Sequence, residues 1–257
     1  MLGKHLPLTF RSSGRLLLLG TILVTAFAGT AAAEEEFPST QGLRVQTAET
    51  HATMTPEKAL TLLKEGNQRF VSGNMHKRDL RKKVLITSKG QYPFAAIVGC
   101  IDSRAPHEMV FDAGIGDIFS IRIAGNFINT DILGSLEFAT AIADANLIVV
   151  LGHTECGAIK GACDNIKMGN LTHTLSNIAP AVYSVEGFEG SRNSKNEAFV
   201  DAVAHTNVEL AVNAIVERSP ILRTRIDAGK LMVVGAMLDI STGQVTFMEP
   251  KRQGKAN

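Results

Sequence analysis

Two cysteines and one histidine in this 257-residue chain are of the types that bind metal ions in proteins. His153 and Cys156 form an H-x-x-C motif, and Cys100 lies far upstream of it. Two thiolates and one imidazole are a ligand set of catalytic zinc, which takes three protein ligands and leaves its fourth position open for water. The sequence therefore predicts a Cys₂His zinc site, provided that the fold brings Cys100 to the motif.

A carboxylate and a guanidinium follow the first cysteine in the segment Cys100-Ile101-Asp102-Ser103-Arg104. Arg104 can hold the carboxylate of Asp102 through two parallel hydrogen bonds, which fix its orientation and keep it ionised. An ionised aspartate beside a metal site can accept a hydrogen bond from water and take part in its activation. An ordinary ion pair is the alternative, but the position next to a candidate zinc ligand favours the catalytic interpretation.

The candidate ligands also allow two other interpretations. Cys100 and Cys156 could form a disulfide, which an oxidising compartment would favour and which leaves His153 without a role. Alternatively, both cysteines are small apolar core residues and His153 is an ordinary hydrogen-bonded histidine. The third cysteine, Cys163, is expected in the core, because seven helical residues place it about 10 Å along the axis from Cys156.

Alternating strands and helices are predicted around these residues. Residues 131–145 repeat apolar side chains at helical spacing between short apolar runs that are typical of strands buried on both faces. This alternation indicates a mainly parallel α/β sheet. Because the carboxyl ends of parallel strands lie side by side, Cys100 and the H-x-x-C motif are expected to converge at one edge. The strands are predicted at residues 94–100, 118–123 and 147–151.

Further helices and a hairpin are predicted on either side of this segment. Thr55 suits an N-cap and Pro56 a first helical position, so a helix is expected from there to Gly73. The stretch that contains Pro180 and Gly187 is predicted to be rich in loops. We expect a single domain over residues 55–257, with a mainly parallel central β-sheet flanked by helices. The remaining predicted elements are helices at residues 157–167, 196–218 and 219–229 and strands at residues 231–240 and 244–248.

The N-terminus has the pattern of a secretory signal peptide. A basic and polar start precedes an apolar run over residues 16–28, and Ala31-Ala32-Ala33 forms an A-x-A cleavage site. We expect cleavage of residues 1–33 near Ala33 and a periplasmic or otherwise exported protein without a membrane contact. A retained anchor is the alternative, because residues 16–33 are near the lower length limit for spanning a bilayer. Residues 34–54 are predicted to be a flexible leader.

The overall composition is that of an ordinary globular protein. Apolar residues make up 45% of the chain and charged residues 20%, which excludes wholesale disorder. The formal net charge is +1, which is too small to indicate a protein that binds nucleic acid or a membrane surface.

The two motif blocks together resemble the signature of the β-class carbonic anhydrases, and the similarity extends from about Thr55 to Thr246. The resemblance implies one Zn²⁺ per chain on Cys100, His153 and Cys156, with Asp102 and Arg104 as a catalytic dyad. It also implies the reversible hydration of CO₂ to bicarbonate and a proton, in which a hydroxide on zinc attacks CO₂. The resemblance further implies that the protein forms a homodimer or a higher even oligomer, with active sites near the subunit boundary. Segments 116–119, 122–126 and 134–139 are similar to the same family.

The resemblance further implies which residues contact the substrate. Gln91 matches a glutamine that hydrogen-bonds substrate, and Phe119 and Phe138 match positions in the pocket wall. Phe138 is commonly a tyrosine in the family, so this pocket would lack one hydroxyl. Gly157 would let the backbone approach the substrate.

Three other functions remain open from the sequence alone. Relatives with the same zinc set hydrolyse carbonyl sulfide or carbon disulfide, and access to the pocket decides between these substrates. A non-catalytic zinc-binding or redox protein would use the same ligands but needs neither the dyad nor Gln91. A nucleotide-binding module is the third, but Gly114-Ile115-Gly116 lacks the third glycine and the helix of that motif.

Overall fold

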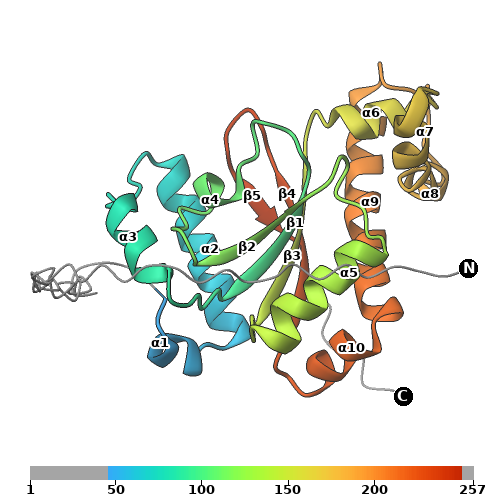
Figure 1. Cartoon of the computed structure of the whole chain (residues 1–257). Coiled ribbons are helices and arrows are strands. Elements are labelled where there is room, and N and C mark those ends of the chain that lie inside the picture. The colour runs from blue at the N-terminus through green and yellow to red at the C-terminus, as the bar shows by residue number, and fades with distance from the viewer. Residues whose placement is uncertain (1–45, 251–257) are drawn as a thin grey trace, which may run out of the picture. The chain divides into compact units, whose positions relative to one another are not determined.

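A five-stranded sheet forms the centre of the computed structural model, which describes residues 46–250 (Figure 1). The strand order is β2-β1-β3-β4-β5; the first four strands are parallel and the last pair is antiparallel. This architecture confirms the predicted α/β fold with a mainly parallel sheet. The strands are β1 (Ala95–Gly99), β2 (Ile118–Arg122), β3 (Leu147–His153), β4 (Met232–Leu238) and β5 (Val245–Phe247).

The apolar runs form strands because both faces of the sheet are covered. Every residue of β1, β3 and β4 is buried, which is the pattern of central strands in a parallel sheet. Strand β2 lies at the edge of the sheet and is only partly buried. Part of β2 is therefore accessible to another molecule.

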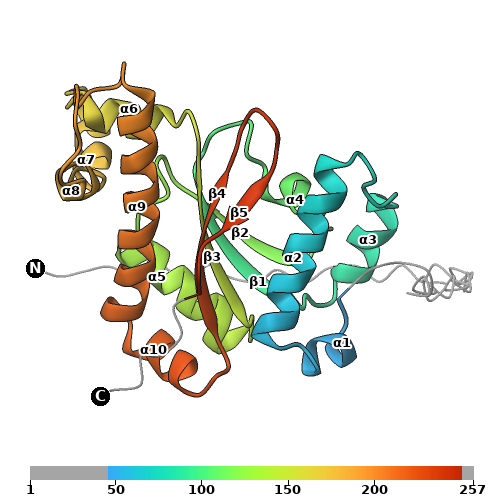
Figure 2. The same cartoon turned by 180° about the vertical axis from the view of Figure 1, so that it is seen from behind.

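Helices form a layer on each face of the sheet (Figures 1 and 2). On one face, α2 (Pro56–Val71) and α4 (His107–Val110) pack against an apolar cluster that includes Ile97 and Val149. On the other face, α5 (Thr130–Glu137), α9 (Glu197–Arg218) and α10 (Pro220–Asp227) enclose the larger cluster. Alternate residues of β1 and β3 thus contribute to two separate cores.

Helix starts follow the capping residues in the sequence. Thr55 accepts a hydrogen bond from the backbone N–H of Lys58, and Pro56 begins α2, as predicted. Asn196 caps α9 in the same way. Ser219 caps α10, and its hydroxyl also donates to the Glu137 carboxylate of α5 over 2.6 Å.

Several predicted helix bounds differ from the structure. The helix predicted over 131–145 is α5 followed by a π-helical turn, η1 (Phe138–Ile142). The helix predicted over 157–167 ends earlier, as α6 (Gly157–Cys163), because Asn165 takes a left-handed conformation (φ 51°). The stretch predicted to be rich in loops contains α8 (Ala179–Ser184), in which Pro180 lies in the first turn. Three further helices were not predicted: α3 (Leu80–Thr87), α4 and α7 (Gly169–Ser176).

Part of the predicted flexible leader is ordered. Helix α1 (Ala48–Ala52) begins with a capping box between Thr47 and Thr50, in which each side chain accepts from the other's backbone N–H. Residues 34–45 and the predicted signal peptide, residues 1–33, lie outside the described residues. Within residues 46–250, no helix is long and apolar enough to cross a membrane.

The glycines considered for nucleotide binding pack against a buried ion pair instead. The ammonium of Lys83 is 3.0 Å from the Asp117 carboxylate, which also accepts from the N–H of Gly114. A Cβ on Gly114 would lie 1.9 Å from the Lys83 ammonium. Gly114 therefore makes room for the lysine that anchors α3 to the turn before β2.

Candidate metal centre

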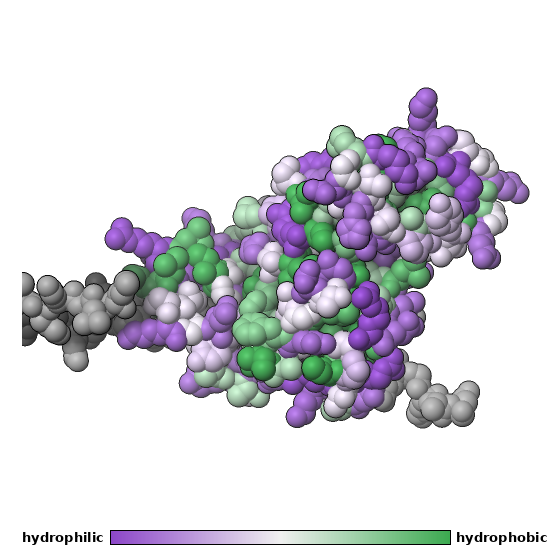
Figure 3. All heavy atoms as spheres, turned by 45° about the vertical axis from the view of Figure 1, so that its right-hand side comes forward, coloured by the Kyte–Doolittle hydropathy of each residue, from purple (hydrophilic) through white to green (hydrophobic). Residues whose placement is uncertain are grey.

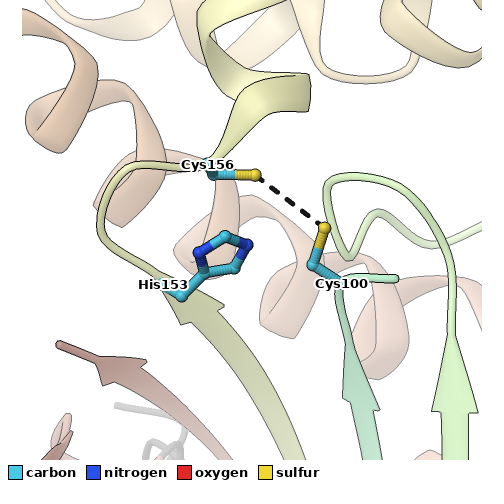
Figure 4. Close-up of side chains that lie close together, drawn as sticks. All are labelled: Cys100, His153 and Cys156. Carbon is cyan, nitrogen blue, oxygen red and sulfur yellow. Dashed lines mark hydrogen bonds between the residues drawn. The ribbon is translucent and has the colours of Figure 1, made fainter. Parts of the chain in front are cut away.

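The three predicted ligands meet at the carboxyl edge of the sheet (Figure 4). Strands β1 and β3 pair in parallel with Gly99 opposite Leu151. Cys100 directly follows β1 and therefore lies beside the last residues of β3. His153 is the last residue of β3, and Cys156 precedes α6. Glu155 lies between them in the left-handed region (φ 58°), which turns the chain from the strand into the helix. The sequence prediction of convergence is confirmed.

The spacing of the ligand atoms suits one metal ion. The two Sγ atoms are 3.9 Å apart, and all three ligand atoms lie within 4.8 Å of one another. Tetrahedral zinc with Zn–S bonds of about 2.3 Å would separate two sulfurs by about 3.8 Å. A disulfide requires an S–S distance of about 2.0 Å, and both cysteines are free. The distance therefore favours a metal site over the disulfide interpretation.

The orientation of His153 leaves one ring nitrogen available for a metal. Nδ1 lies 2.8 Å from the carbonyl oxygen of Thr154, to which it donates when it carries the proton. Nε2 is then unprotonated, buried and without a hydrogen-bond partner in the structure. A buried nitrogen lone pair without a partner is costly, and a metal ion would satisfy it. Thr154 is itself fixed, because its hydroxyl accepts from the N–H of Ile240.

Burial of two thiols side by side changes their acidity. The hydrogen bond with Cys156 lowers the pKa of Cys100 against the effect of burial, and the N–H of Gly125 adds a bond to the Cys100 sulfur over 3.3 Å. The same contact with Cys100, together with burial, raises the pKa of Cys156. The proximity of the two sulfurs therefore opposes ionisation of both thiols at once. A divalent cation would favour ionisation of both.

Asp102 and Arg104 form the predicted bidentate pair next to the ligands. The Nε and Nη2 atoms of Arg104 donate to the two carboxylate oxygens over 2.9 and 2.8 Å. These bonds hold the pKa of Asp102 well below its usual range, although partial burial opposes them. Asp102 Oδ2 is 3.9 Å from Nε2 of His153. The carboxylate thus faces the metal site while it stays bonded to Arg104.

The predicted substrate-binding residues are not all near this cluster. Gly157 is exposed at the start of α6, and a Cβ there would meet no atom within 4 Å. Phe119 pairs with Ala96, four residues before Cys100, which is about 13 Å along a strand. Gln91 is exposed and precedes β1, so it lies near the amino end of the strand, whereas Cys100 follows the carboxyl end. Of the predicted substrate-binding residues, Gly157 directly follows a ligand of its own chain.

Phe119 and Phe138 instead line a groove between β2 and α5. Their rings make an edge contact with centroids 6.3 Å apart. The groove has a volume of about 640 Å³, and its floor includes Ile121 and Gly134. Half of the Phe138 side chain is exposed, and apolar side chains reach the surface on this side of the molecule (Figure 3).

One prediction about the cysteines is confirmed, and two contributors were missed. Cys163 is buried in the core outside the ligand cluster. The N–H of Gly125 donates to the Cys100 sulfur, and the guanidinium of Arg122 donates to backbone carbonyl groups of Cys100 and Asp102. Neither residue was predicted to contribute to the site. Both residues lie in the segment 122–126, whose resemblance was the only signal for them.

Comparison with known proteins agrees with this site. The family model for carbonic anhydrase matches residues 95–245, which include all three candidate ligands. "Carbonic anhydrase 2" of Mycobacterium tuberculosis is 35% identical over 200 residues, covering 76% of this chain and 93% of that protein. The carbonic anhydrase of Mycolicibacterium smegmatis is 32% identical over 196 residues, covering 74% of this chain and 92% of that protein.

Solved structures have the same fold. A tetrameric β-carbonic anhydrase from Sordaria macrospora is 27% identical, with a TM-score of 0.57 over 63% of this chain and 84% of that chain. The Coccomyxa β-carbonic anhydrase in complex with acetazolamide has the same TM-score at 24% identity, over 74% of this chain and 87% of that chain.

The fold, the Cys₂His cluster and these similarities define the class of protein. The chain belongs to the β-class carbonic anhydrases. It is accordingly a zinc-dependent lyase that catalyses the reversible hydration of CO₂.

Proposed function

We propose that Cys100, His153 and Cys156 hold the zinc ion of this carbonic anhydrase and that Asp102 and Arg104 are its catalytic pair. The observation that carries this assignment is the buried Nε2 of His153, which lacks a hydrogen-bond partner and lies beside two thiols 3.9 Å apart. Gly157 starts α6 directly after a ligand, where its exposed backbone leaves room for a small substrate.

The chain's own residues prepare the site for chemistry on water and CO₂. Zinc, when bound, would supply a Lewis acid that lowers the pKa of water and so favours its attack on CO₂. The carboxylate of Asp102 accepts a hydrogen bond from the reacting water and orients it. Arg104 keeps Asp102 ionised and fixes its two oxygens. Burial of all three ligands excludes bulk water from the sulfurs.

Removal and return of the metal tests the assignment. Treatment with a chelator is expected to abolish CO₂ hydration, and zinc added back is expected to restore it. Full hydration by protein that holds no zinc would contradict the assignment.

We also propose that the active unit is a homodimer, alone or within a higher even oligomer, built on the groove between β2 and α5. The edge strand and the exposed Phe138 leave an apolar surface that a second copy would cover. Phe119 lies opposite Ala96, four residues before Cys100, its ring contacts that of Phe138, and Gln91 precedes β1. On the proposed dimer, Gln91, Phe119 and Phe138 contribute to the site of the partner subunit.

Finally, we propose that the protein is exported, with cleavage near Ala33, and equilibrates CO₂ and bicarbonate outside the cytoplasm. The support is the basic start, the apolar run and the alanine cluster of residues 1–33. Fractionation of cells that express the full chain is expected to place a shortened protein in the periplasmic or secreted fraction. Detection of full-length protein in the cytoplasmic fraction alone would contradict export.

A further inference from the structure

We propose that Arg122 is a positioning residue: it holds the backbone on either side of Ile101 and thereby places the Asp102–Arg104 pair against the metal site. This inference rests on the proposed role of that pair. It concerns a residue on the edge strand β2, which contacts neither the ligand atoms nor the carboxylate of Asp102.

Arg122 joins β2 to the segment that follows β1. Its Nε donates to the carbonyl oxygen of Cys100 over 2.9 Å, and its Nη2 donates to the carbonyl oxygen of Asp102. In the sheet register, Arg122 is paired with Gly99, the last residue of β1. Its long side chain therefore reaches the two residues just beyond the end of the strand, and one planar guanidinium fixes both carbonyl groups.

The segment held by Arg122 connects β1 to α4. Residues 100–106 belong to no helix or strand. Within the segment, the N–H of Ala105 bonds to the carbonyl of Asp102, and the N–H of Arg104 bonds to the Asp102 carboxylate over 3.0 Å. These bonds are internal and would move with the segment. Outside the segment, the Nη2 atom of Arg104 also donates to the carbonyl oxygen of Glu155 over 3.4 Å, and Ala105 packs in the core. The distance of 3.9 Å between Asp102 Oδ2 and His153 Nε2 therefore depends on these contacts together with the two bonds from Arg122.

A second contact from β2 holds the far end of the same segment. The hydroxyl of Ser120, on the same face of β2 as Arg122, lies 2.8 Å from Nδ1 of the fully buried His107. The ring of His107 packs so closely on Gly99 that a Cβ there would lie 2.1 Å from Nε2. Strand β2 thus fixes the chain at residues 100–102 and again at residue 107.

The chain offers a matched control for a purely structural arginine. Arg192 also donates to two backbone carbonyl groups, those of Val185 and Val182, each over 2.7 Å. It lies outside the segment that carries Asp102 and Arg104. Removal of either arginine costs two hydrogen bonds to backbone, but only the loss of Arg122 would move the catalytic pair.

The test compares purified wild-type protein with Arg122→Met, Arg122→Lys and Arg192→Met. Zinc content, kcat and KM for CO₂ hydration, melting temperature and the visible spectrum of the Co²⁺-substituted protein are measured for each. We expect Arg122→Met to keep its zinc and its KM and to lose roughly tenfold to a hundredfold in kcat, because small misplacements of catalytic groups have effects of this size. The Co²⁺ spectrum is expected to change with it.

Arg122→Lys is expected to restore part of the kcat, since an ammonium donates hydrogen bonds but lacks the bidentate geometry. Arg192→Met is expected to melt at a lower temperature with wild-type kcat per zinc and a wild-type Co²⁺ spectrum. If Arg122→Met does not fold, Arg122→Lys carries the test through its reduced kcat and altered spectrum.

Three results would overturn the proposal. They are wild-type kcat and spectrum in the Arg122 variants, loss of zinc from a folded Arg122→Met protein, or an equal loss of kcat in Arg192→Met. Wild-type protein that holds zinc but hydrates no CO₂ would contradict the proposed function instead. In that case the Co²⁺ spectra would still decide the role of Arg122.

Discussion

At the scale of single residues, the structure separates the candidate metal ligands from the aspartate proposed to act beside them. The ligand atoms of Cys100, His153 and Cys156 form one buried cluster. Asp102 stays outside it, because both of its oxygens are engaged by Arg104. Metal binding and catalysis should therefore respond differently to substitution.

Substitution of Asp102 tests this separation. Asp102→Asn is expected to retain about one zinc per chain and to lose about a hundredfold or more in kcat, the usual size of a general acid–base contribution. Stopped-flow hydration and metal analysis on the same sample measure both quantities. Asp239→Asn, which changes an aspartate bonded to Ser241 on the surface, is the matched control. Wild-type kcat in Asp102→Asn would refute the catalytic assignment.

The rate of hydration is expected to increase toward alkaline pH. Two thiolate ligands cancel the double charge of zinc, which then acidifies water less than it would with three neutral histidines. Asp102 adds no inflection between pH 6 and 9, because Arg104 holds its pKa below its usual range and it stays ionised throughout. A rate profile that is flat down to pH 6 would disagree with this expectation.

The sequence sufficed to predict that the three candidate ligands converge and that Arg104 pairs with Asp102, but not which residues surround them. Cys100 and the H-x-x-C motif follow apolar runs directly, so a parallel sheet had to bring them together. Arg122 also ends such a run, but no pattern in the sequence indicates which carbonyl groups a long side chain will reach.

At the scale of elements, central strands were easier to predict than short helices. The runs that form β1, β3 and β4 are apolar at every position because both faces are covered. Helix α3 escaped prediction because its buried residue is a lysine, Lys83, whose charge is neutralised by Asp117. Such a pair is formed by tertiary contact and leaves no amphipathic pattern in the sequence.

The short helix α4 carries a group that makes stability depend on pH. Burial, with a contribution from the charge of Arg122, lowers the pKa of His107 to about 4. In the unfolded chain a histidine titrates near pH 6.5, so the unfolded state binds more protons between these values. The contribution of neutral His107 is therefore complete above about pH 6.5 and is lost as the pH falls toward 4. At about 1.4 kcal/mol per pH unit, the loss is about 3 kcal/mol.

Urea unfolding of metal-free protein at pH 7 and pH 4 measures this effect. The free energy of unfolding of the wild type is expected to fall by about 3 kcal/mol more than that of His107→Gln, which has no titrating ring. Equal losses in the two proteins would show that His107 is not the group responsible.

At the scale of the whole molecule, the proposed dimer would connect the groove between β2 and α5 to activity. Gly134 of α5 lines this groove, and a Cβ at this position would meet no atom within 4 Å in the single chain. A longer side chain therefore fits the isolated fold but would obstruct a second copy. Helix propensity even favours the replacement of an interior glycine, by up to about 1 kcal/mol.

Gly134→Glu is accordingly expected to fold with an unchanged or higher melting temperature, to sediment as a monomer and to lose most of its CO₂ hydration. Analytical ultracentrifugation and stopped-flow assays check the two effects together. Thr224→Glu adds the same charge at an exposed position of α10 and should leave both unchanged. A fully active Gly134→Glu monomer would argue against sites shared between subunits.

The most direct test of the central claim is stopped-flow CO₂ hydration by the protein from Glu34 onward, with zinc determined on the same sample and Cys156→Ser as the control. We predict about one zinc per chain in the wild type and hydration that is lost, together with the metal, in the variant. Zinc-loaded wild-type protein without hydration, even at alkaline pH, would contradict the account and point to a sulfur-containing relative of CO₂ as the substrate.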